Sequence, residues 1–236
     1  MALCKSITKV IRGSIMQSNI SLQGSKSSAI EINKVLKNTY MLLSMTLAFS
    51  AVTAAISMAM NLPRGAALVM TLVAFGLMFV VNKKADSASG IFWIFAFTGL
   101  MGASLGPMLS HYASMPGGPA IILQALGGTA LIFFALSGYA LTSKKDFSFM
   151  GGFLMVGLIV AVVAMIANIF FQIPALSLAI SAAVIMIMSG LILFDTSRII
   201  HGGETNYIRA TISLYLSVYN IFVHLLSMLG IMGGDD

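Results

Sequence analysis

Residues 208–230 read Ile208-Arg-Ala-Thr-Ile-Ser-Leu-Tyr-Leu-Ser-Val-Tyr-Asn-Ile-Phe-Val-His-Leu-Leu-Ser-Met-Leu-Gly230. This stretch is long and apolar enough to cross a bilayer. It also carries polar residues at steps of four, three, four and three, namely Ser213, Ser217, Asn220, His224 and Ser227. On a helix these side chains form one stripe. Because lipid offers polar groups no partners, the stripe predicts an interior helix with other helices packed around it. The serines can equally serve as small residues for close helix packing.

The composition is that of an integral membrane protein. Of 236 residues, 58% are hydrophobic and 8% are charged, whereas about 25% of residues are charged in soluble domains. Apolar stretches of about 20 residues recur, as membrane helices require. The sequence therefore predicts an all-α bundle of seven transmembrane helices within residues 39–232, with the last helix central. The predicted spans are 39–60, 66–82, 90–110, 119–142, 150–171, 175–196 and 208–231.

Residues 1–38 form a basic amino-terminal tail in this prediction. Lys5, Lys9 and Arg12 share one face of a helical projection, and Gly13 follows as a possible helix end. Two interpretations stay open for this segment. It is either a short helix on an anionic membrane surface or a charged tail without stable structure.

The distribution of basic residues predicts the orientation in the membrane. In the predicted topology, 12 of the 13 Lys and Arg residues fall on one side of the membrane, and Arg64 alone falls on the other side. Cytoplasmic segments carry an excess of Lys and Arg. We therefore expect a cytoplasmic amino terminus and an external carboxyl terminus, where residues 233–236 form a short acidic end.

The sequence shows no recognisable catalytic apparatus. It contains no HExxH or Walker motif and no nucleophile elbow of the GxSxG type between a strand and a helix. Its three histidines are far apart and lack carboxylates at metal-ligand spacing, so we expect neither catalytic residues nor a metal site. Gly102 and Gly106 form a GxxxG in the third span, which favours close helix packing over a binding role.

Asp195 is the acidic residue that lies within a predicted span, near the end of span six. A carboxylate at low dielectric pairs with a cation or takes up a proton, so Asp195 is a candidate proton sensor or ion ligand. The alternative is a structural pair with Arg198, which lies three residues further on the same helical face. Lys83 and Lys84, at the end of span two, are other possible cation partners.

Several segments resemble a known family. Leu193-Phe-Asp-Thr196, His201-Gly-Gly-Glu-Thr-Asn-Tyr-Ile-Arg209 and Ser213-Leu-Tyr-Leu-Ser-Val-Tyr-Asn220 are similar to the carboxyl-terminal signature of the Bax inhibitor-1 (transmembrane BAX inhibitor motif) family. Other similar pieces are Phe97-Thr-Gly-Leu-Met-Gly-Ala-Ser-Leu-Gly-Pro107 and Lys145-Asp-Phe-Ser-Phe-Met-Gly-Gly152. The resemblance extends from residue 33 onward and is closest to the proteobacterial YccA branch.

The resemblance implies a seven-helix bundle and two alternative activities. One is a pH-dependent calcium leak controlled by two aspartates, of which Asp195 matches the first while Ser217 stands at the position of the second. Two carboxylates can share one proton because of their mutual repulsion, and a serine cannot supply that coupling. Asp195 bonded to Ser217, or paired with Arg198 or a lysine of span two, remains able to titrate. Asn220 and His224 complete this set of ion- and proton-sensing candidates. No cofactor beyond transiently permeating Ca²⁺ is implied.

The other implied activity is modulation of FtsH, the ATP-dependent protease of the bacterial inner membrane. Similarity to the YccA branch implies a protein that binds and restrains this protease and is also its slow substrate. The tail with Lys5, Lys9 and Arg12 is then the segment that the protease grips, and the packed bundle resists extraction. The missing second aspartate favours this non-enzymatic activity over the leak.

Overall fold

The fold is a bundle of membrane-length helices. The computed structural model describes the backbone of residues 2–143 and 145–233 and, within these ranges, the side chains from residue 30 onward. Within this part, seven helices are long and apolar enough to cross a membrane, which confirms the predicted all-α seven-span fold. The elements are α1 (Ala2–Ala59), α2 (Arg64–Lys84), α3 (Gly90–Ala113), α4 (Gly118–Ser143), the short 3₁₀ helix η1 (Ser148–Met150), α5 (Gly151–Phe171), α6 (Pro174–Ile200) and α7 (Tyr207–Met232).

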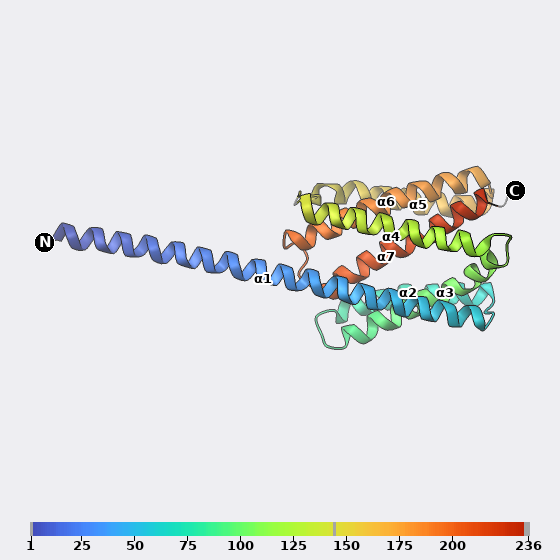
Figure 1. Cartoon of the computed structure of the whole chain (residues 1–236), viewed down its shortest axis with the longest axis horizontal. Coiled ribbons are helices and arrows are strands. Elements are labelled where there is room, and N and C mark those ends of the chain that lie inside the picture. Colours follow the sequence, from blue (N-terminus) through green and yellow to red (C-terminus); the bar gives the residue numbers. More distant parts are fainter. Residues whose placement is uncertain (1, 144, 234–236) are drawn as a thin grey trace.

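Helix α1 begins much earlier than the first predicted span. It runs without a break from Ala2 to Ala59, so the predicted helix end at Gly13 is wrong. Its membrane-length part is Ile30–Ala59, and its amino-terminal part extends away from the bundle (Figure 1). The side chains of Lys5, Lys9 and Arg12 lie outside the described residues, as do residues 234–236 of the predicted acidic end.

Helix α7 lies at the centre of the bundle, as its polar stripe predicts. It packs against α1, α2, α3, α4 and α6, and Figure 1 shows it running between α1 and α4. The ring of Tyr215 in α7 is fully buried and meets the Phe97 ring of α3 edge-on, with 5.7 Å between the ring centroids. A helix that contacts five others holds the bundle together from inside.

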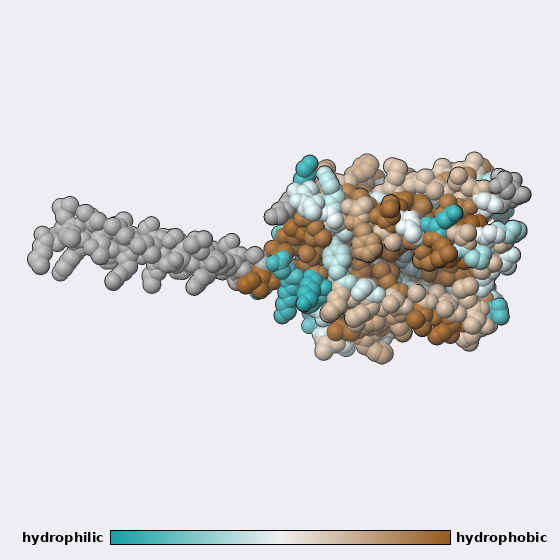
Figure 2. Space-filling model, in the orientation of Figure 1, coloured by the Kyte–Doolittle hydropathy of each residue, from teal (hydrophilic) through white to brown (hydrophobic). Residues whose placement is uncertain are grey.

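The outer surface of the bundle is apolar, as lipid contact requires. Figure 2 shows hydrophobic residues over most of the visible face and hydrophilic residues towards the two ends. Exposed leucine, valine and phenylalanine side chains cover α2 and α5, for example Leu72 and Phe153. We call the end with the α2–α3, α4–α5 and α6–α7 connections the basic end. Its described basic residues are Lys34, Lys37, Lys83, Lys84, Lys145, Arg198 and Arg209, whereas Arg64 lies at the opposite end.

Helices α1 and α3 approach each other closely at two glycines. A Cβ atom at Gly102 would collide with the carbonyl oxygen of Ser50, and one at Gly106 would collide with the side chain of Ser57. Pro107 lies inside α3, which continues to Ala113. The structure thus confirms the packing role predicted for Gly102 and Gly106.

A tight turn at the end of α6 brings the chain back towards α7. Gly202 has a positive φ of 74°, a conformation that glycine adopts without steric cost. The N–H of Gly203 donates to the carbonyl of Arg198 at 2.8 Å, and that of Gly202 donates to the carbonyl of Ile199 at 3.2 Å. This is a Schellman motif, in which backbone N–H groups beyond the helix satisfy its last carbonyls. It places Arg198 and the start of α7 at the same end of the bundle.

The α4–α5 connection is fastened to α6 by Ser197. The N–H of Phe147 donates to the Ser197 hydroxyl at 2.9 Å, and this hydroxyl donates to the carbonyl of Lys145 at 3.3 Å. The neighbouring Asp146 accepts hydrogen bonds from the hydroxyl and the N–H of Ser148, and these bonds hold the pKa of its exposed carboxyl below the ordinary value. These bonds hold the α4–α5 connection against the end of α6.

Candidate functional site

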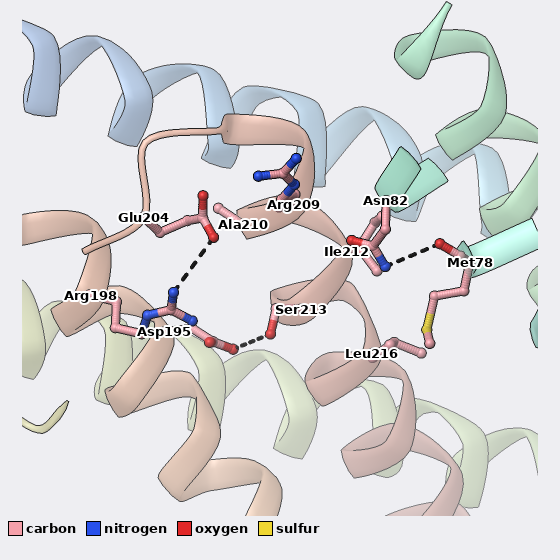
Figure 3. A pocket seen from close by; sticks show the side chains of 10 residues that line it. All are labelled: Met78, Asn82, Asp195, Arg198, Glu204, Arg209, Ala210, Ile212, Ser213 and Leu216. Carbon is pink, nitrogen blue, oxygen red and sulfur yellow. Dashed lines mark hydrogen bonds and ion pairs between the residues drawn. The ribbon is translucent and has the colours of Figure 1, made fainter. Parts of the chain in front are cut away.

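A polar cavity of about 280 Å³ opens at the basic end, between α2, α6 and α7. Figure 3 shows the side chains that surround it. Charged residues gather on the α6 and α7 sides, whereas α2 contributes a methionine and an amide. The lining residues are Met78, Asn82, Asp195, Arg198, Glu204, Arg209, Ala210, Ile212, Ser213 and Leu216. The cavity brings together side chains from helices that are distant in the sequence.

Asp195 lies at the inner part of this cavity and is 7% exposed. Its carboxylate oxygen Oδ2 accepts a hydrogen bond from the Ser213 hydroxyl of α7 at 2.6 Å. A buried carboxylate is costly unless hydrogen bonds or cations compensate the lost hydration. Ser213 supplies one such hydrogen bond and at the same time connects α6 to α7.

Arg198 lies on the rim of the cavity and faces the α6–α7 connection. Its Nη2 donates to the carbonyl of Gly203 at 3.1 Å and lies 3.8 Å from Oε2 of Glu204. Its guanidinium carbon is 5.5 Å from the centre of the Phe194 ring. Among the described residues Arg198 therefore forms its ion pair with Glu204, and the proposed pair with Asp195 is not formed. The reason is the Schellman turn, which brings Glu204 and the Gly203 carbonyl over the guanidinium group.

Lys83 and Lys84 are exposed at the end of α2 and do not line the cavity. The residues that α2 presents there are Met78 and Asn82, and the Asn82 amide donates to the carbonyl of Met78 at 3.1 Å. Each position on a helix projects its side chain in a fixed direction, so neighbouring residues can differ in whether they face a cavity or solvent. The lysines therefore face away from Asp195.

The polar stripe of α7 reaches α6 at two levels. Ser213 bonds Asp195, and Nδ1 of His224 lies 3.2 Å from the Ser181 hydroxyl. Between these levels the stripe bonds its own helix. The Ser217 hydroxyl donates to the carbonyl of Ser213 at 3.2 Å, and the Asn220 amide donates to the carbonyl of Leu216 at 2.8 Å. Asp195 and His224 thus have separate partners on opposite sides of the Ser217 and Asn220 level.

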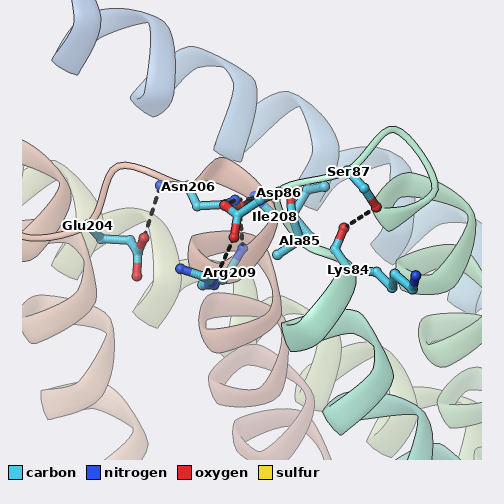
Figure 4. A network of polar contacts seen from close by, with 8 residues as sticks. All are labelled: Lys84, Ala85, Asp86, Ser87, Glu204, Asn206, Ile208 and Arg209. Atoms are coloured by element: carbon cyan, nitrogen blue, oxygen red, sulfur yellow. Dashed lines mark hydrogen bonds and ion pairs between the residues drawn. The ribbon is translucent and has the colours of Figure 1, made fainter.

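A second polar network lies at the basic end beside the cavity, and it was not predicted from the sequence (Figure 4). The Asn206 side chain caps α7 by accepting from the N–H groups of Ile208 and Arg209 at 2.9 and 3.2 Å. Its amide donates to the Ala85 carbonyl at 3.0 Å and to the Asp86 carboxylate at 2.8 Å. An asparagine directly before an apolar helix is a preferred N-cap, and this signal was available in the sequence.

Arg209 joins the cavity to this network. Its Nη2 donates to Oδ2 of Asp86 at 2.6 Å, while its side chain also lines the Asp195 cavity. The α2–α3 connection is therefore held to the start of α7 by an amide and an ion pair. These contacts hold the α2–α3 connection in place beside the cavity.

The arrangement is suited to holding water or to exchanging a proton with solvent at the basic end. It offers a buried carboxylate, a hydroxyl donor and two arginines around a small polar space. One turn of α6 deeper than Asp195, the side chain of Ile192 is fully buried. Within the described residues, no group of three or more His, Cys, Asp or Glu side chains is placed to hold a metal ion.

Comparison with known proteins places the chain in a family. Residues 32–234 match the family described as "Inhibitor of apoptosis-promoting Bax1". The chain belongs to the Bax inhibitor-1 family. The matched region contains the whole Asp195 cavity and nearly all of the membrane-length part of α1.

Relatives of this chain occur in bacteria. It is 56% identical over 217 residues to the Escherichia coli K12 protein named "Modulator of FtsH protease YccA", which covers 92% of this chain and 98% of that protein. It is 57% identical over 208 residues to an uncharacterized membrane protein of Vibrio cholerae, covering 88% of this chain and 93% of the relative. The likeness therefore extends over nearly the whole length of both relatives.

Proposed function

We propose that this protein modulates an FtsH-type membrane protease of the bacterial inner membrane, without catalysing a reaction itself and without a cofactor. The observation that carries the proposal is the 56% identity, over 92% of the chain, to the protein named "Modulator of FtsH protease YccA". A relative with the same identity is named "Inner membrane protein YccA", which supports the location.

The basic end faces the cytoplasm in this proposal. Lys and Arg are enriched in the cytoplasmic connections of membrane proteins, and the described basic residues gather at this end. The amino-terminal part of α1 leaves the bundle at the same end (Figure 1). The carboxyl terminus, after seven spans, then lies in the periplasm. This orientation presents residues 2–29 to a cytoplasmic ATPase.

Modulation arises from slow extraction. The protease engages the segment of α1 outside the bundle, and the pull then meets helices that pack closely against α1. Contacts at Gly102 and Gly106 leave α3 in van der Waals contact with the α1 backbone, and α7 packs against α1 as well. A substrate that is gripped but unfolds slowly occupies the protease and reduces degradation of other substrates.

Degradation of a reporter membrane protein in proteoliposomes tests the proposal. We expect the full-length protein to slow reporter degradation by purified protease and to be degraded slowly itself. Removing residues 2–29 should abolish both effects, whereas removing residues 233–236 at the other terminus should abolish neither. Undiminished inhibition and turnover after the amino-terminal deletion would rule out this mechanism.

A pH-sensitive cation leak is the second candidate function. The observation that favours it is the buried Asp195 carboxylate in a polar cavity at the basic end. Calcium flux into sealed liposomes, at mildly acidic and mildly alkaline pH, separates the two functions. A leak that changes in Asp195→Asn would support the second candidate. Flux no greater than that of empty liposomes, from folded protein, would exclude it.

A further inference from the structure

A second cavity, of about 610 Å³, lies between α1 and α4 and has α7 as its floor. We call it the lateral groove, and define it by Tyr40, Ala51, Leu126, Phe133 and Tyr215. Helices α1 and α4 each pack against α7, and Figure 1 shows α7 between them. The lining residues Ala51 and Leu126 are exposed, so the groove opens sideways towards the lipid.

The lateral groove offers an apolar surface. Leucine, alanine, methionine, isoleucine, valine and phenylalanine side chains make up most of its lining. The tyrosine hydroxyls at its floor already have partners, because Tyr215 bonds the Ser50 hydroxyl at 2.8 Å and Tyr219 bonds the Ser104 hydroxyl at 3.2 Å. These hydroxyls therefore need no hydrogen bond from a ligand, and the groove suits a hydrocarbon chain.

The size of the lateral groove fits a small ligand. Its volume of about 610 Å³ falls in the range of small-ligand sites, roughly 300–1,000 Å³. A single acyl chain is a ligand of this size class.

The half of the groove nearest the basic end matches an acyl chain in length. One leaflet of a bilayer core is about 15 Å thick, half of roughly 30 Å. Ten residues of α1 rise by the same distance, at about 1.5 Å per residue. A chain that starts at Tyr40 therefore reaches the level of Ser50, while the lining of the groove continues along α1 to Met58, about 27 Å from Tyr40.

Lys37 marks the headgroup end. The rings of Tyr40 and Phe133, with 5.9 Å between their centroids, line the groove at the basic end. Lys37 is exposed one turn of α1 before Tyr40, on the same helical face, which places its charge at the headgroup level. Basic side chains at this depth attract anionic headgroups. We propose that the lateral groove binds one acyl chain of an anionic phospholipid from the leaflet at the basic end, with the phosphate at Lys37. This inference does not depend on the proposed protease function.

Native mass spectrometry of the full-length protein, released from detergent after exchange with phosphatidylglycerol or phosphatidylcholine, tests the proposal. We expect one tightly retained phospholipid and about a fivefold preference for the anionic lipid. Lys37→Gln should abolish this preference, and Lys34→Gln, which removes an exposed lysine one turn further from Tyr40, should preserve it. Equal retention of both lipids by the wild type, or an unchanged preference in Lys37→Gln, would overturn the headgroup assignment.

A matched pair of tryptophan substitutions tests the groove itself. Helical side chains point towards the amino-terminal end of their helix, so Ala51→Trp places its indole in the space assigned to the chain. Its retained lipid should fall to near zero. Ala48→Trp lies on the exposed part of α1 outside the groove and should retain the lipid. Equal retention by two folded variants would overturn the proposal.

Crosslinking distinguishes lipid from protein occupants if Ala51→Trp does not fold. In membranes, Ala51→Cys in a Cys4→Ser background should react with a maleimide carried on a lipid chain. It should form no adduct with a second copy or with another membrane protein when a bifunctional thiol reagent is added. A protein adduct at this position, without lipid labelling, would show that a helix occupies the groove and would refute the proposal.

Discussion

The carboxylate of Asp195 is the buried acidic group of the cavity at the basic end. A hydrogen bond from a neighbouring helix stabilises it. Ser213 of α7 donates to it at 2.6 Å. Arg198 and Arg209 line the same space but form their ion pairs with Glu204 and Asp86. Ser213 therefore bonds Asp195 directly, whereas the two arginines only line the same cavity.

The hydroxyl of Ser213 should matter more to stability than that of Ser217. Ser213→Ala removes a hydrogen bond to a buried carboxylate and should lower the unfolding free energy by about 1.5–3 kcal/mol. Ser217→Ala removes a bond to a carbonyl of its own helix and should cost about 1 kcal/mol or less. Denaturant titration of both variants in mixed micelles measures the difference. Equal losses would show that Ser213 does not hold the carboxylate.

The sequence identified Asp195 but not its partner, for a physical reason. A stripe of polar residues defines one face of α7, yet Ser213 and Ser217 both lie on that face, about one turn apart. Which of them meets Asp195 depends on how far α6 and α7 are shifted along their axes, and that shift is determined by packing. The same holds for Lys83 and Lys84, which lie just beyond the turn of α2 that faces the cavity.

Two contacts between elements determine how the helices are arranged. Gly102 and Gly106 allow α3 to lie against α1, and Asn206 attaches the start of α7 to the α2–α3 connection. Neither contact depends on apolar area alone. Both depend on the size or the hydrogen-bonding groups of one side chain.

Gly102→Ala should destabilise the bundle, because the added methyl group would meet the carbonyl oxygen of Ser50. Overpacking of this kind costs about 1–3 kcal/mol. Gly127→Ala is the matched control, since nothing lies within 4 Å of a Cβ atom there. It should be neutral or stabilise α4 by up to about 1 kcal/mol. Thermal unfolding in detergent compares the two, and a similar stability of both variants would contradict the close α1–α3 contact.

Asn206→Ala should weaken the junction between α7 and the α2–α3 connection. It removes an N-cap, typically about 1 kcal/mol, together with the bonds to Ala85 and Asp86. Asp86→Ala removes the exposed pair with Arg209, and exposed pairs contribute only about 0–1 kcal/mol. Hydrogen exchange at the start of α7 should therefore rise more in Asn206→Ala. Faster exchange in Asp86→Ala would assign the junction to the ion pair.

Span positions were predictable because apolar length determines them, whereas the start of α1 was not. The predicted spans of α2 to α7 agree with the observed helices to within a few residues. The polar, serine-rich residues before the first span carry no membrane signal, and Gly13 and Gly24 disfavour a helix only weakly. Neither feature predicts a helix that is continuous with the first span.

On the scale of the whole molecule, we expect the amino-terminal part of α1 to add little to the stability of the bundle. Among the side chains that the structure describes, the first on α1 that pack against the hydrophobic core are Val35 and Leu36. Deleting residues 2–29 should therefore change the unfolding free energy by no more than about 0.5 kcal/mol. Thermal unfolding of the truncated protein measures this. A large loss of stability would show that the segment is part of the folded bundle.

The unbroken course of α1 has a mechanical consequence. A helix that continues from Ala2 into the membrane transmits tension along its own axis to the interfaces with α3 and α7. Tension in that direction loads these interfaces in shear, so their contacts resist together and do not open one after another. The stiffness of a single rod thus converts many weak contacts into one high barrier against being drawn out of the membrane.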